Sequence, residues 1–306
     1  SIFALPKFRN IMDKMITRDI AYIGVDDTDL DLFESQYIIP NGISYNSYLI
    51  KDKKIAIMDT ADNRKIDEWL GNLRTALDGR TPDYLVVQHM EPDHAGCIAE
   101  ILEEYPAIKI VASARAIQMM PQFFEGKDFS HNTIAVKEGD TLCLGEHTLQ
   151  FFMAPMVHWP EVMVTYDKKD KVVFSADGFG KFGALSHEED WACEARRYYF
   201  NICGKYGGPV QALLKKLATL DVECICPLHG PILKENLGYY IGLYDTWSKY
   251  DVETEGVFIA YASIHGGTAA VANVMAEILR EKGAKKISVA DLSRDDMAEA
   301  IEDAFR

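Results

Sequence analysis

The sequence has no apolar run long enough to cross a membrane and a clear shortage of positive charge. Its 306 residues contain 32 lysines and arginines against 47 aspartates and glutamates, a formal net charge of -15. No stretch approaches the roughly 18 uninterrupted apolar residues of a membrane helix, and the N-terminus lacks the charged-then-apolar pattern of a signal peptide. An acidic surface repels phosphate backbones and anionic lipids. We therefore expect a cytoplasmic protein that binds neither nucleic acid nor a membrane.

The sequence also lacks any CxxC pair. This absence argues against rubredoxin-type iron, a zinc ribbon and a dithiol redox pair within the chain. The six cysteines stand apart, in apolar or helical contexts, at Cys97, Cys143, Cys193, Cys203, Cys224 and Cys226. We expect them to be buried, reduced thiols.

Length and hydrophobic content indicate one large core and part of a second. The chain is 48% hydrophobic, and single cores stop growing near about 250–300 residues. In residues 1–254, strands and helices alternate in two runs, which suits two sheets sandwiched between helices. Residues 255–306 form the start of a βαβα unit that is too short to cover both faces of a parallel sheet. We expect two domains with these bounds.

The predicted elements follow from hydrophobic periodicity and turn residues. The strands of the first domain are 44–51, 54–59, 84–87, 148–153, 162–166, 171–175 and 223–226. A tight turn at 52–53 joins the first two strands into a hairpin. The helices of this domain are 95–105, 191–203, 209–220 and 237–249. In the second unit, strands 257–262 and 286–291 alternate with helices 266–280 and 295–305.

The densest cluster of possible metal ligands is the segment 89–94, which reads His-Met-Glu-Pro-Asp-His. It places His89, Glu91, Asp93 and His94 between a predicted strand and a helix. Alternate residues of an extended chain point to the same side, so these four cannot easily serve one ion unless the loop turns. Two neighbouring ions would divide the ligands naturally.

Three further polar residues stand just after predicted strands: His158, Asp177 and His229. A lone histidine or aspartate near a strand end is more often a turn former or a satisfied polar group. Seven such residues with the same placement indicate a metal site. This context is missing for the remaining four histidines, which are His131, His147, His187 and His265.

The pattern H-x-E-x-D-H, followed by single H, D and H, resembles that of the flavodiiron proteins within the metallo-β-lactamase superfamily. The resemblance spans essentially the whole chain. Zinc hydrolases of the superfamily have H-x-H-x-D-H instead, so Glu91 is the discriminating residue. A carboxylate in place of an imidazole makes the site harder and more anionic, which suits iron better than zinc. The resemblance implies an αββα metallo-β-lactamase-like sandwich over residues 1–254.

The resemblance also implies a role for each of the seven residues at two non-haem irons. The ligands of the iron nearer the flavin would be His89, Glu91 and His158. The ligands of the other iron would be Asp93, His94 and His229, and the bridging carboxylate would be Asp177. Open positions on both ions would hold a bridging hydroxide or oxo group and the diatomic substrate. In some family members the counterpart of His94 swings away from the metal.

A glycine-rich loop follows the predicted strand 257–262 and opens the helix 266–280. Its residues are Ser263, Ile264, His265, Gly266, Gly267 and Thr268. Backbone N–H groups and the helix dipole bind phosphate at such a place, although a turn without any ligand has the same local pattern. Placed after the metal domain, the loop resembles the first phosphate loop of the flavodoxin module in flavodiiron proteins and implies FMN. Residues 255–306 would be the N-terminal, truncated part of a flavodoxin-like, doubly wound parallel domain.

The resemblance implies an oxidoreductase that reduces dioxygen to water, nitric oxide to nitrous oxide, or both, with electrons delivered through FMN. The electron donor would be a rubredoxin or a reduced deazaflavin. The resemblance further implies a head-to-tail homodimer, or a dimer of such dimers, because in this family the flavin of one subunit lies near the diiron site of its partner. Two alternatives stay open: a dinuclear hydrolase of the metallo-β-lactamase superfamily, and a flavodoxin-like electron carrier with a degenerate β-lactamase domain. A measurement of iron content would distinguish the oxidoreductase from these two alternatives.

Overall fold

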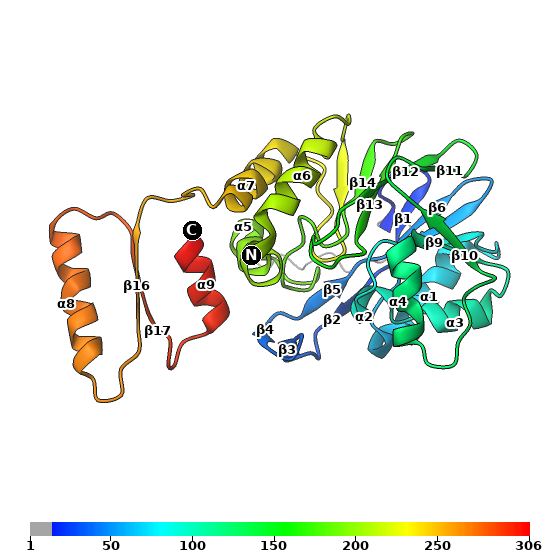
Figure 1. Cartoon of the computed structure of the whole chain (residues 1–306). Coiled ribbons are helices and arrows are strands. Elements are labelled where there is room, and N and C mark those ends of the chain that lie inside the picture. The colour runs from blue at the N-terminus through cyan, green and yellow to red at the C-terminus, as the bar shows by residue number, and fades with distance from the viewer. Residues whose placement is uncertain (1–13) are drawn as a thin grey trace, which may run out of the picture.

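The computed structural model describes residues 14–306, in which two sheets pack face to face between two layers of helices (Figure 1). The first sheet has six strands in the order β1 (Ile20–Tyr22), β6 (Tyr48–Lys51), β7 (Ile55–Met58), β8 (Tyr84–Val87), β9 (Lys109–Ser113) and β10 (Thr133–Val136). The second has five strands in the order β11 (Thr141–Cys143), β12 (Thr148–Met153), β13 (Met163–Asp167), β14 (Val172–Phe174) and β15 (Cys224–Cys226). Two small ribbons pair β2 (Val25–Asp27) with β5 (Ile43–Tyr45) and β3 (Leu32–Phe33) with β4 (Tyr37–Ile38).

Helices cover the outer face of each sheet (Figure 1). Those beside the first sheet are α1 (Ile66–Leu77), α2 (Pro92–Ala95), α3 (Ile98–Glu104) and α4 (Ala114–Phe123). Those beside the second sheet are α5 (Trp191–Ile202), α6 (Gly207–Leu217) and α7 (Leu237–Lys249). Short 3-10 helices occupy Asn63–Lys65 and Gly204–Tyr206. Across residues 14–306, no helix combines the length and the apolar composition that a membrane crossing requires.

Side-chain alternation along the strands divides the sandwich into three cores. On β6 and β7, Leu49 and Ile57 pack toward α1 and α3, whereas Tyr48 and Met58 pack toward the second sheet. This follows because successive side chains of a strand point to opposite faces. Both faces of each central strand are therefore buried, and these strands read as continuous apolar runs rather than as alternating ones.

Most predicted elements are confirmed within a few residues, and β8, β12 and α7 have the predicted bounds. The single strand predicted at 44–51 is wrong, because the chain leaves one sheet and enters another at Asn46 and Ser47. The Asn46 amide donates to the carbonyl oxygens of Pro227 and Gly230, at 2.8 Å each. The predicted helix 95–105 begins only at Ile98, after the separate turn α2. Sequence periodicity did not reveal the strands β1, β2, β3, β4, β9, β10 and β11 or the helices α1, α2 and α4.

All six cysteines are free. The expectation of buried thiols is confirmed for Cys97, Cys203, Cys224 and Cys226. It is wrong for Cys193, which is partly exposed, and for Cys143, which is exposed. Cys143 lies on β11 at the edge of its sheet, where one side of the strand faces solvent.

The C-terminal segment adds a parallel pair, β16 (Val257–Tyr261) and β17 (Ile287–Asp291), with helices α8 (Gly267–Glu281) and α9 (Met297–Phe305). Helix α9 lies between this pair and α5 (Figure 1). The buried Arg196 of α5 forms ion pairs with Glu302 of α9 and with Glu253, the latter at 2.5 Å. Removing one partner of a buried ion pair leaves an uncompensated charge. Buried ion pairs, as well as apolar packing, therefore hold the C-terminal segment against the sandwich.

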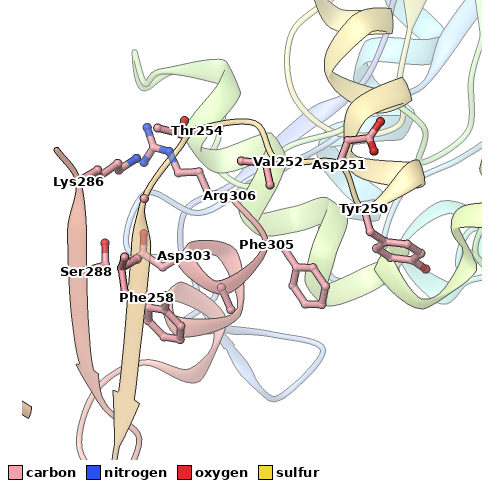
Figure 2. Close-up of a pocket in the computed structure, with 13 residues that line it drawn as sticks. Tyr250, Asp251, Val252, Thr254, Phe258, Lys286, Ser288, Asp303, Phe305 and Arg306 are labelled. Carbon is pink, nitrogen blue, oxygen red and sulfur yellow. The ribbon is translucent and has the colours of Figure 1, made fainter. Parts of the chain in front are cut away.

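A hollow of about 260 Å³ lies between the end of α7 and the C-terminal segment, and Figure 2 shows its lining. The rings of Tyr250 and Phe305 approach each other there, with centroids 6.2 Å apart, and Lys286 and Arg306 lie at the same hollow. It contains none of the seven candidate ligands. The hollow is therefore separate from the candidate metal site.

Candidate metal centre

The structure brings all seven candidate ligands together at one end of the sandwich. Four come from the loop between β8 and α2 and from α2 itself, and the other three follow strands β12, β14 and β15. All are buried, with at most 9% of each residue exposed. They form two adjacent groups. The first group is His89, Glu91, His158 and Asp177, and the second is Asp93, His94 and His229.

The first group places two imidazole nitrogens opposite two carboxylate oxygens. His89 Nε2 lies 3.1 Å from Glu91 Oε2 and 3.3 Å from Asp177 Oδ2. His158 Nε2 lies 3.0 Å and 3.1 Å from the same two oxygens. The two Nε2 atoms are 3.2 Å apart. Four nitrogen and oxygen donors that converge this closely surround a point suited to a cation.

The second group is built around the Asp93 carboxylate. Its Oδ1 lies 3.4 Å from His94 Nε2, and its Oδ2 lies 3.3 Å from His229 Nε2. The chain can bring His229 this close because residue 180 is glycine. A side chain at Gly180 would place its Cβ 3.4 Å from the Cβ of His229 and 3.0 Å from the Asp177 carbonyl oxygen.

Asp177 lies between the two groups and faces both. Its Oδ2 approaches His89 and His158 of the first group, whereas its Oδ1 lies 3.0 Å from His94 Nε2 and 3.8 Å from His229 Nε2 of the second. One carboxylate with an oxygen toward each group has the geometry of a bridging ligand.

The donor atoms of the centre are buried and lack ordinary hydrogen bonds. Among the described residues, neither carboxylate oxygen of Asp93 or Asp177 has a hydrogen-bond partner, nor has Nε2 of His94 or His229. The distances of 3.0 to 3.8 Å between these atoms are ion-pair distances without hydrogen-bond geometry. Buried carboxylates are costly unless they are hydrogen-bonded, paired or coordinated to metals. The residues present therefore fit two adjacent cations.

The charges of the cluster oppose the effect of burial on each pKa. Burial favours neutral imidazole, but Asp93 and Asp177 raise the pKa of His94 to about 9. Burial is likewise outweighed at His158, where the nearby carboxylates of Asp177 and Glu91, 3.1 and 3.0 Å from its Nε2, raise the pKa to about 9. Despite burial, His94 and His89 hold the pKa of Asp177 well below its usual range. Without metal, the cluster holds protons that bound cations would displace.

Two hydrogen bonds direct imidazoles toward the centre. His89 Nδ1 donates to Glu161 Oε1 at 2.8 Å, and the same oxygen accepts from the Met90 N–H at 2.9 Å. His229 Nδ1 donates to the Ser44 carbonyl oxygen at 2.7 Å. Each bond leaves Nε2 facing the ligand groups, as is usual for metal-binding histidines. Within residues 14–306, His94 Nδ1 has no such partner, so His94 is held less firmly.

Sequence reasoning missed Glu161 because a single acid in a loop has no pattern of its own. The available signal was its position in the same loop as His158, three residues further on. The ring of Trp159, in the same loop, lies 5.2 Å from that of His89, edge to face. Tyr198 also lies at the centre, 5.5 Å from the His229 ring. Tyr199 packs on Tyr244 in the core beside α7, at 5.1 Å.

A third group of possible ligands, His147, Asp167 and Asp170, lies at the opposite end of β12. His147 Nδ1 donates to Asp167 Oδ2 at 2.9 Å, and Nε2 lies 3.4 Å from Asp19 Oδ2. Both ring nitrogens thus already face carboxylates. The group acts as a buried ion pair that ties the turn after β13 to the start of β1.

The predicted phosphate loop lies between β16 and α8, apart from the metal centre. Gly266 has a positive φ of 83° and caps α8, whose first turn therefore presents free N–H groups. Ile264 is 91% exposed, and Ser263 Oγ has no hydrogen-bond partner among the described residues. An open helix N-terminus with an unpaired hydroxyl fits a phosphate group.

Comparison with known proteins agrees with this architecture. Residues 43–230, more than half of the chain, match the family model described as ODP family beta lactamase. The structure is similar to rubredoxin oxygen:oxidoreductase of Desulfovibrio gigas, with a TM-score of 0.89 and 29% identity over 95% of this chain and 74% of that one. It is also similar to a variant of the flavo di-iron protein of Thermotoga maritima, with a TM-score of 0.85 and 26% identity over 94% and 73%.

The chain belongs to the flavodiiron protein family. The predicted fold class, a metallo-β-lactamase-like sandwich followed by part of a flavodoxin-like domain, is thereby confirmed. An uncharacterized protein of Methanocaldococcus jannaschii is 35% identical over 88% of this chain and 68% of its own length. Anaerobic nitric oxide reductase flavorubredoxin of Escherichia coli is 30% identical over 96% and 64%. Diflavin flavoprotein A 1 of Synechocystis is 32% identical over 94% and 51%, so this flavodiiron chain spans half to two thirds of these curated relatives.

Proposed function

We propose that this flavodiiron chain carries the catalytic centre of an oxidoreductase that reduces dioxygen, nitric oxide or both at two non-haem irons. The ligands would be the two groups described above, with Asp177 as the bridge. The single observation that carries the proposal is the position of Asp177 between a His-Glu-His set and an Asp-His-His set. The carboxylate of Glu91 stands where superfamily hydrolases have imidazole, and it favours iron over zinc.

Two irons and a reduced flavin would together supply the four electrons that convert dioxygen to water, or the two that convert two nitric oxide molecules to nitrous oxide. The residues of the chain would hold the two metal sites at a fixed separation and orientation. Asp177 fixes the separation of the two groups, and Glu161 and the Ser44 carbonyl fix the imidazoles of His89 and His229. Tyr198 Oη is buried and has no partner among the described residues, so it can donate a hydrogen bond at the centre.

Electrons would reach the centre through FMN, with its phosphate on the loop from Ser263 to Thr268. This loop alone offers no surface that would enclose a flavin ring. The relatives of known structure are longer than this chain. Flavorubredoxin and rubredoxin oxygen:oxidoreductase carry rubredoxin in their names, which supports a rubredoxin-type donor, with reduced deazaflavin as the second candidate.

A head-to-tail homodimer, or a dimer of such dimers, belongs to the same proposal. The described phosphate loop and the seven candidate ligands share no element of the fold. A flavin bound on one subunit could therefore serve the metal centre of another.

The test begins with protein produced in iron-sufficient cells and purified without oxygen. We expect about two irons per chain, since the site has two donor groups, and a magnetic spectrum of a coupled mixed-valent pair after partial reduction. With a chemical reductant, the protein should consume dioxygen or nitric oxide. Zinc in place of iron, with hydrolysis of thioesters or phosphoesters and no gas consumption, would favour the dinuclear hydrolase and refute the proposal.

A further inference from the structure

An apolar cavity of about 280 Å³ lies between helices α6 and α7 and the strands β14 and β15. Its walls include Val173, Leu214, Leu217, Ile225 and Phe179. Of the residues that the structure describes, Asp221 is the one charged residue in its lining. Enclosed cavities of about 150 Å³ with leucine, isoleucine and phenylalanine walls bind benzene or xenon, and this cavity has the same kind of walls, although it opens to solvent beside Ile241. This cavity therefore favours small uncharged molecules over water and ions.

The cavity is separated from the metal centre by one pair of stacked rings. Phe179 follows Asp177 by two residues, and its ring lies 4.3 Å from that of Tyr244. On the other side of this pair, Tyr244 and Tyr198 line a small internal space of about 10 Å³ together with Asp177 and His158. The apolar cavity, the pair of rings and the candidate ligands thus lie next to one another in this order.

The polar opening of the centre lies on a different side. A hollow of about 260 Å³ reaches Glu91 and Asp93, and its lining also includes Glu34, Asp62 and Arg64. Charged walls attract water and ions, whereas an uncharged gas gains more from apolar surroundings. The two openings therefore differ in the molecules that they admit.

We propose that the apolar cavity binds the uncharged diatomic substrate and is its route to the metal centre, with the Phe179 ring as the gate. This inference rests on the proposed function, because only a gas-consuming centre needs such a route. The gate is fixed at its backbone: the Phe179 N–H donates to Tyr244 Oη at 2.6 Å, and φ is 67°. Opening this route would require the Phe179 ring to move away from the Tyr244 ring on which it stacks.

Two alanines on the same helix provide a test and its control. Ala218 caps α6, is exposed and lines the cavity. Ala212 is exposed on α6 and lies outside the cavity lining. Ala218→Phe should fill the cavity at little cost in stability, and Ala212→Phe adds the same ring elsewhere.

The first measurement is xenon binding to metal-free protein, by crystallography under xenon pressure or by xenon NMR. We expect xenon in the cavity of the wild type and of Ala212→Phe, and none in Ala218→Phe. No xenon in the wild-type cavity would overturn the proposal. So would a change of oligomeric state confined to Ala218→Phe, because the cavity would then be an interface between copies.

The second measurement is gas consumption by the reduced, iron-loaded protein. Ala218→Phe should raise the KM for the gas about tenfold at unchanged kcat, which is the signature of impaired access, and Ala212→Phe should match the wild type. Phe179→Ala, which keeps the backbone N–H, should lower the KM. Equal KM values in all variants, despite the expected xenon result, would overturn the route. Wild-type protein that binds xenon and consumes neither gas would instead overturn the proposed function.

Discussion

Glu161→Gln is the change that tests most directly how this flavodiiron chain orients its ligands. The carboxylate is buried and accepts hydrogen bonds from His89 Nδ1 and the Met90 N–H. The amide has the same size and can still accept a hydrogen bond, but it has no charge with which to support the metal-bound imidazole. The substitution therefore removes the electrostatic part of the interaction and leaves the packing in place.

The expected effect is on one metal ion more than on the other. Loss of a hydrogen-bonding partner of a metal-bound histidine typically costs about 10–100-fold in metal affinity, or about 1.4–2.8 kcal/mol. His89 belongs to the first ligand group, so the affinity for that ion should fall by this amount. The second ion should be affected less, because it depends on His89 only through the shared Asp177.

The assay is anaerobic titration of metal-free protein with Fe²⁺, followed by calorimetry, with thermal unfolding of the metal-free form measured in parallel. Glu146→Gln is the matched control, since Glu146 is exposed and pairs only with Lys169 in the described structure. Equal affinities of the Glu161 variant and the wild type for both ions would refute the positioning role. A metal-free variant that no longer unfolds cooperatively would identify Glu161 as a folding residue instead.

Three further predictions concern the ligands themselves. Asp177→Ala should lose both ions, since a bridging carboxylate serves two coordination spheres, whereas His94→Ala should lose at most one. If metal analysis found two irons in Asp177→Ala and none in His94→Ala, these roles would be reversed. Glu91→His should shift metal content from iron toward zinc and abolish gas reduction, and an active iron-loaded variant would contradict this. Without metal, the pKa values of His94 and His158 are about 9, so both imidazoles carry a proton that metal binding should release. The affinity for metal should therefore increase as the pH is raised toward about 9. A metal affinity that does not change between pH 6.5 and 8.5, a range below both pKa values, would show that these imidazoles are already neutral.

The sequence by itself determined which residues are candidates for the metal centre. The segment 89–94 and the three later residues give the ligand types in order, and their placement after apolar strands indicated that they converge. Glu91 distinguished the pattern from the H-x-H-x-D-H of zinc hydrolases, and the proposal of iron rests on this difference. Local periodicity sufficed for β12, α7 and the elements of the C-terminal segment, because these elements carry a distinct apolar pattern or clear turn residues at their ends.

Tertiary structure alone decided how the candidate ligands are oriented and which cavities lie beside them. Glu161 binds His89 across 72 residues, and the Ser44 carbonyl binds His229 across 185. Asn46 interrupts a predicted strand because its partners lie 181 and 184 residues away. The apolar cavity likewise exists only where α6, α7, β14 and β15 meet. Contacts between residues so distant along the chain leave no local pattern, because they form only when the two sheets and their helices pack together.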